Sequence, residues 1–86
     1  GTKVKTLHRI VDETVEALEF SITEDVPFIG VPLKDLRLKS GILLAGIVRQ
    51  NGQIVIPSGE DALNLNDDVI VVTTRTTLHD IRDILQ

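Results

Sequence analysis

Apolar and β-branched residues gather in the middle of the chain, between Ile42 and Thr74. Two continuous apolar runs, ILLAGIV over 42–48 and VIVV over 69–72, have the composition typical of strands buried on both faces of a sheet. The pattern predicts that these two strands form the centre of the sheet.

An Asn-Gly pair at Asn51 and Gly52 lies just after the first of these runs. Asn and Gly tolerate the positive φ values that a type I′ turn requires at both central residues. Pro57 can donate no ladder hydrogen bond, so it should close the strand that runs from Gln53 to Ile56. The pattern predicts a β-hairpin here.

Alternating residues nearer the start of the chain predict a further strand over residues 15–22, with Leu18, Phe20 and Ile22 on one face. Residues 4–11 show near-helical spacing but are few and partly β-branched, so helix and extended linker remain equally open. We interpret residues 1–12 as a linker, or as the start of a domain from a larger protein, and residues 13–86 as a single domain.

Two helices are expected around the central strands. Pro32 at a first helical position, followed by spaced leucines, predicts one or two helical turns that end before Gly41. Near the end of the chain, Thr77 and Asp80 have the spacing of a capping box. The apolar stripe of this second helix would consist of Leu78, Ile81, Ile84 and Leu85. The predicted fold class is α+β, a small mixed or antiparallel sheet of about four strands with two helices packed on it.

Size and charge narrow the class of protein. A chain of 86 residues holds one core, and a partner surface often adds burial at this size. The absence of cysteine excludes disulfides and thiolate chemistry. A net charge of −4 with only two aromatic residues argues against nucleic-acid binding. No apolar run reaches the roughly 18 residues of a membrane span, so no direct membrane insertion is expected.

Pairs of polar residues offer weak candidates for metal or catalytic sites. His79 and Asp83 are four residues apart, as are His8 and Asp12, which is the spacing of a two-ligand metal half-site on a helix. A solvated histidine beside a carboxylate explains the same pattern, and the sequence offers no evident third ligand, so no metal site is predicted.

A Ser-His-Asp hydrolase could be assembled from Ser58, His79 and Asp67, but no Gly-x-Ser-x-Gly motif surrounds the serine. No catalytic residues are predicted, and we expect the chain not to be an enzyme. A small hydrolase or metal-binding enzyme domain is the remote alternative.

Three cations and one glycine suggest binding instead. Arg37, Lys39 and Arg49 could converge on an anion at one edge of the sheet, or be separate solvated charges. Gly46 interrupts a predicted buried strand, which it weakens unless a helix or a second subunit approaches the backbone closely.

Four segments together resemble the C-terminal regulatory domain of TrkA-type proteins, the subunits of Trk potassium uptake systems. They are VKTLHRIVDETVEALEFSI, VPLKDLRL, ILLAGIVRQNGQIVIPSGEDALNLNDDVIVVTT and LHDIRDIL, in this order. Each segment is only weakly specific, but their order and spacing cover nearly the whole chain.

The resemblance implies a cytoplasmic, ligand-sensing module that forms a homodimer and regulates potassium transport. In this family the domain follows a Rossmann domain that holds an NAD- or ATP-type nucleotide. It works with a membrane potassium-translocating subunit, peripheral to the inner face of the membrane. No cofactor is expected in this chain itself. The alternative is the same accessory domain from a cation antiporter or an anion symporter.

The resemblance also implies a ligand cleft lined by Leu43, Leu44 and Pro57, with Lys39 nearby and Arg37 and Arg49 as candidate anion contacts. Cyclic di-AMP binds in one branch of the family. That branch has an arginine and an asparagine where this chain has Lys39 and Leu43, which counts against this ligand.

Overall fold

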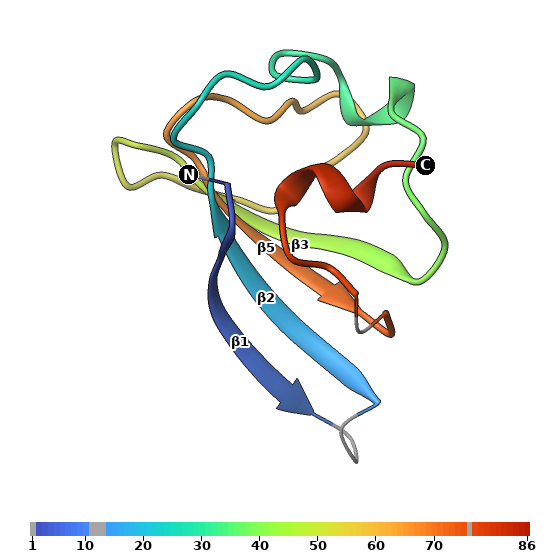
Figure 1. Ribbon diagram of the computed structural model, residues 1–86. Coiled ribbons are helices and arrows are strands. Elements are labelled where there is room, and N and C mark those ends of the chain that lie inside the picture. Colours follow the sequence, from blue (N-terminus) through green and yellow to red (C-terminus); the bar gives the residue numbers. More distant parts are fainter. Residues whose placement is uncertain (1, 11–13, 76) are drawn as a thin grey trace.

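The computed structural model describes residues 2–10, 14–75 and 77–86 and shows one five-stranded antiparallel sheet (Figure 1). The order across the sheet is β1-β2-β5-β3-β4. The strands are β1 (Val4–Ile10), β2 (Val15–Ser21), β3 (Ile42–Val48), β4 (Ile54–Val55) and β5 (Asp68–Thr73). Strand β5 is central and β3 adjoins it, which confirms the predicted centre of the sheet.

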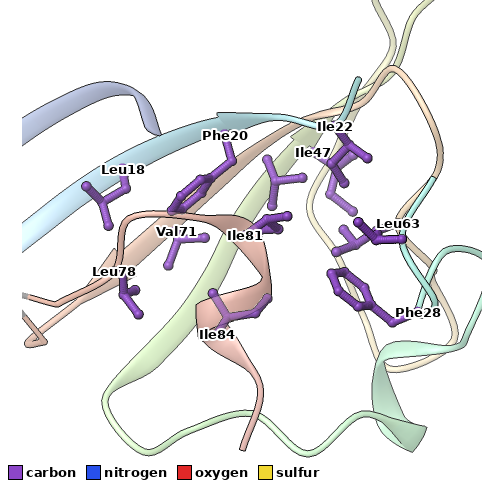
Figure 2. Close-up of a cluster of buried hydrophobic side chains, with 12 residues drawn as sticks. Leu18, Phe20, Ile22, Phe28, Ile47, Leu63, Val71, Leu78, Ile81 and Ile84 are labelled. Carbon is purple, nitrogen blue, oxygen red and sulfur yellow. The ribbon is translucent and has the colours of Figure 1, made fainter. Parts of the chain in front are cut away.

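One face of the sheet carries the core. Buried and half-buried residues alternate along β2 and β5, so only every second side chain faces the core. Figure 2 shows side chains such as Phe20, Val71, Ile81 and Ile84 meeting between the sheet and the C-terminal segment. The prediction that the central strands are buried on both faces is therefore wrong.

The predicted α+β class is also wrong, because the described residues contain no α-helix. Only two short 3-10 helices occur, η1 (Leu33–Asp35) and η2 (Ile81–Ile84). The backbone beyond η1 bonds instead to the end of the chain. Lys39 N donates to the Ile84 carbonyl oxygen at 2.8 Å, and Gln86 N donates to the Arg37 carbonyl oxygen at 2.8 Å. These tertiary bonds replace the hydrogen bonds of a continued helix.

The second helix begins later in the chain than the sequence predicted. Asp80, rather than Thr77, caps η2, and Asp83 completes the capping box. The preceding backbone is bonded to the start of the chain, since Val4 N donates to the His79 carbonyl oxygen at 3.2 Å. An isolated helix this short is marginal in water, so these bonds decide its length.

The hairpin between β3 and β4 forms where predicted, but with another turn. Gly52 has a φ of 88°, whereas Asn51 does not have the positive φ that a type I′ turn needs. Gly52 N donates to the Arg49 carbonyl oxygen, and Arg49 N donates to that of Gln53. This is the pattern of a three-residue loop that ends in a left-handed glycine.

Residues 4–10, for which helix and linker were both open, form the edge strand β1, a fifth strand beyond the four expected. The structure thus shows them as part of the sheet. Within the described ranges, no helix is long and apolar enough to cross a membrane.

Candidate functional site on β3 and the open face

Two of the expected ligand residues, Leu43 and Leu44, lie on opposite faces of β3. Leu43 is 61% exposed and is paired with Val72, on the face away from the core. Leu44 is paired with the buried Val71 and packs against the core. Within one copy of the chain, these two side chains therefore do not line the same cleft.

Lys39 and Pro57 lie at different places around β3. Lys39 is half-buried and precedes the strand, with its backbone bonded to Ile84. Pro57 is half-buried and follows β4, whose pairing with β3 ends at Val55. Of the expected ligand residues, Leu43 is the one with a largely exposed side chain.

The guanidinium group of Arg49 binds other residues of the same chain. Its Nη1 atom donates to Asp67 Oδ2 at 2.6 Å and to the Ala62 carbonyl oxygen at 2.9 Å. The same Asp67 oxygen accepts from Asn64 N at 2.7 Å, and Asp67 is only 1% exposed. This buried ion pair joins the end of β3 to the loop before β5.

The three candidate anion contacts do not form one cluster. Arg37 and Lys39 precede β3, whereas Arg49 follows its last residue. A seven-residue strand spans roughly 20 Å, so Lys39 and Arg49 lie at opposite ends of β3. The arrangement instead leaves Arg37 and Lys39 as neighbours at the start of that strand.

The candidate hydrolase residues each have other partners. Ser58 N and Oγ contact Asp61 Oδ2 at 2.7 and 3.2 Å. Asp67 binds Arg49, and the carbonyl of His79 is bonded to Val4 in β1. Ser58 therefore belongs to a turn and Asp67 to an ion pair, while the bonds of His79 are made by its backbone.

Among the candidate metal residues, Asp83 has a structural role. Asp83 Oδ2 accepts from the backbone N–H groups of His79 and Asp80 at 2.9 and 3.0 Å, so it serves as part of the cap. His8 lies in β1, whereas Asp12 is outside the described residues. In the part of the chain that is described, no group of three or more potential ligands could hold a metal ion.

A polar cluster that the sequence did not reveal joins the two ends of the described chain. Thr2 Oγ1 donates to Asp80 Oδ2 at 2.6 Å and accepts from Arg82 Nη1 at 2.9 Å. Burial raises the pKa of Asp80. The Arg82 backbone N–H, the Thr2 hydroxyl and the charges of Arg82 and Lys3 lower it more, so the net pKa is below 3.8. No spacing motif could reveal contacts between residues nearly eighty positions apart.

The face of the sheet opposite the core, here called the open face, is half polar and half apolar. The strand registers place these residues on it: Thr6, His8, Ala17, Glu19, Ser21, Leu43, Gly46, Val48, Ile54, Asp68, Ile70 and Val72. We call the uncharged residues on β5, β3 and β4 the apolar strip. They are Leu43, Gly46, Val48, Ile54, Ile70 and Val72.

The structure thus defines a small antiparallel sheet domain whose buried polar groups serve the fold and whose open face is its most distinctive surface. The chain belongs to the TrkA-C domain family, whose profile matches residues 17–86, and the resemblance seen in the sequence is confirmed.

Individual relatives agree with the family assignment. The chain is 30% identical over 74 residues to the Trk system potassium uptake protein TrkA homolog of Pyrococcus abyssi (strain GE5 / Orsay), covering 86% of this chain and 33% of that protein. It is 30% identical over 69 residues to the TrkA protein of Azorhizobium caulinodans, covering 80% and 15% respectively. A TrkA homolog 1 of Methanosarcina mazei is 29% identical over 70 residues, covering 81% and 17%. The chain spans a third or less of the length of these relatives.

Proposed function

We propose that this chain is a cytoplasmic regulatory domain of a Trk-type potassium uptake system and has no catalytic activity of its own. The observation that carries the proposal is the family match over residues 17–86, together with relatives named as Trk potassium uptake proteins. In this proposal the domain acts as a homodimer, peripheral to the inner face of the membrane. It couples a nucleotide-holding Rossmann domain to a potassium-translocating membrane subunit.

The proposed mechanism is thermodynamic linkage. A ligand that binds across the two-fold axis favours the dimer arrangement to which it binds more tightly. It can bias the potassium pathway only by that difference in affinity. The exposed Leu43, with Lys39 before the same strand, supports a ligand site near the start of β3.

A graft tests the regulatory role. This chain replaces the matching region of the Azorhizobium caulinodans TrkA protein, in cells of that species lacking their own TrkA, and potassium uptake is measured. We expect the chimera to take up potassium faster than a TrkA truncated before this region. The matched control carries Ile84→Asp, which places a charge in the core, and should behave like the truncated protein. Equal uptake by the intact chimera and the truncated protein would contradict the proposal.

Calorimetric titration with cyclic di-AMP tests the ligand site. Binding that is lost in Lys39→Ala and retained in Lys34→Ala, an exposed lysine of η1, would support a site at the start of β3. No heat of binding at millimolar ligand would remove this ligand from the proposal. The domain would then act as a coupling element without it.

A further inference from the structure

Glu16 is a buried carboxylate that the fold leaves without a hydrogen-bond donor among the described residues. Its side chain is 8% exposed and lies on the core face of β2. Arg9 Nε in β1 lies 3.6 Å from Glu16 Oε2, which is longer than a hydrogen bond. By contrast, the buried Asp67 and Asp80 each accept several hydrogen bonds. Burial of a carboxylate without donors is costly, so the role of Glu16 needs an explanation.

A pocket of about 240 Å³ opens on this carboxylate. Among the described residues, no enclosed side-chain oxygen lacks a hydrogen bond, so the Glu16 oxygens are reached from the pocket. The pocket lies on the core face, between β1, β2 and the segment that precedes η2. Figure 1 shows the end of β1 and the start of β2 extending beyond the C-terminal segment. The cover of the core face is therefore incomplete where Glu16 lies.

The walls of the pocket are aliphatic. They come from Val4 and Leu7 in β1, Leu18 in β2 and Leu78 in the C-terminal segment. Figure 2 shows Leu18 and Leu78 at the same end of the buried cluster. Leu7 is 39% exposed, so apolar surface remains there for a ligand to cover. A ligand with an aliphatic body fits such walls, and an ammonium group would supply the charge and the donors that Glu16 lacks.

Two basic side chains also line the pocket. Arg9 and His79 are both largely exposed and thus lie on its solvent side. An arginine guanidinium has five N–H donors in a planar fork that matches a carboxylate. The pocket therefore combines an acidic group at its base, aliphatic walls and a base at its mouth.

We propose that this pocket binds a small aliphatic ammonium compound, with the ammonium group on Glu16 and the aliphatic body against Leu18 and Leu78. Free amines and aliphatic amino acids share this chemistry, and the carboxylate of an amino acid would bind Arg9. This site is on the core face, whereas the exposed Leu43 is on the open face. The inference thus adds a second ligand site to the proposed function.

Three related compounds test the ligand chemistry on the unaltered chain. Leucine is compared with 3-methylbutylamine, which lacks the carboxylate, and with 4-methylpentanoate, which lacks the amine. Backbone amide signals are followed by NMR during titration at neutral pH. We expect both ammonium compounds to shift the signals of β1 and β2, and 4-methylpentanoate to bind at least about tenfold more weakly. Tighter binding of leucine identifies an amino-acid site, and tighter binding of the amine identifies an amine site. Equal binding of 4-methylpentanoate, or no shift with either ammonium compound at millimolar concentration, overturns the proposal.

A matched pair of variants tests the role of Glu16. Glu16→Gln keeps the shape of the side chain and removes its charge, so it should weaken binding of 3-methylbutylamine at least about tenfold. Glu19→Gln, on the opposite face of the same strand, should leave it within about twofold. Circular dichroism confirms that both variants are folded, and the compound series decides the matter if Glu16→Gln is not. Unchanged affinity in folded Glu16→Gln overturns the site, while the uptake experiment separately judges the regulatory role.

Discussion

Among individual residues, buried carboxylates join separate elements of the fold. Asp67 joins the loop before β5 to Arg49 at the end of β3, and Asp80 joins η2 to Thr2. Glu16 is buried on the core face of β2, 3.6 Å from Arg9 Nε in β1. Such groups cost stability if their partners are removed, because a charge is then left in a poorly solvated place.

Removing the partner of Asp67 should be costly. We expect Arg49→Met to lower the free energy of unfolding by about 2–4 kcal/mol, since it strands a buried carboxylate. Urea denaturation measures this change. Arg37→Met, at an exposed position, is the matched control and should change it by less than about 0.5 kcal/mol. Equal effects of the two substitutions would show that the ion pair contributes little.

Asp80 should make stability depend on pH. Its pKa is lower in the folded chain than the ordinary 3.8, so the unfolded chain binds protons more readily. The stabilisation from this group is therefore present above pH 3.8 and is lost as the pH falls below that value through the folded pKa. Asp80→Asn should be less stable than the unaltered chain at about pH 6, and the gap should narrow below pH 3.8. Denaturation by urea at several pH values checks this, and a gap independent of pH would refute it.

For the secondary-structure elements, local sequence signals located the strands better than the helices. Alternation of apolar residues correctly predicted β2, and continuous apolar runs located β3 and β5. The two predicted helices are only 3-10 turns, because the flanking backbone bonds to distant segments instead. A short helix has too few internal hydrogen bonds to be more stable than the backbone bonded to those distant segments.

Gly52 in the β3–β4 hairpin should be required because of its positive φ, and not because a side chain there would clash. Gly52 has a φ of 88°, and a Cβ atom added there would have no neighbour within 4 Å, so Gly52→Ala meets strain but no clash. We expect it to cost about 1 kcal/mol in the free energy of unfolding. Gly46→Ala is the matched control and should not destabilise the monomer, because that glycine has no positive φ. Thermal unfolding at concentrations where the chain is monomeric compares them. Greater damage from Gly46→Ala would contradict this account.

At the scale of the whole molecule, the core depends on the last segment of the chain covering one face of the sheet. Figure 2 shows Leu78, Ile81 and Ile84 of this segment facing side chains of the sheet. Ile81 and Ile84 are fully buried, although η2 itself has only four residues. Packing, rather than helix length, thus holds this segment in place.

Shortening a buried side chain of the C-terminal segment should strongly destabilise the fold. Ile84→Ala should lower the free energy of unfolding by about 2–5 kcal/mol, through lost burial and the cavity that remains. Leu65→Ala, at a position that is 45% exposed, should cost less than about 1 kcal/mol. Urea denaturation of both variants provides the comparison. Similar losses would show that the C-terminal segment is not part of the cooperative core.

The candidate site was predicted only in part. The sequence singled out Gly46 as a strand glycine in need of an explanation, and the structure places it on the open face. Leu43 and Leu44 were expected to line one cleft, but adjacent residues of a strand point to opposite faces. Arg49 was a candidate anion contact, yet its partner Asp67 comes from a loop that no local pattern links to it.

By itself, the sequence determined the family, the three main strands and, for β2 alone, the residues that face the core. These features follow from the order of segments and from side-chain alternation, both of which are written in neighbouring residues. Only the tertiary structure decided that β1 joins the sheet, that the expected helices are single turns, and that one face stays open. Those outcomes depend on hydrogen bonds and packing between distant segments. The free energies of these contacts compete with one another, and no local sequence pattern encodes them.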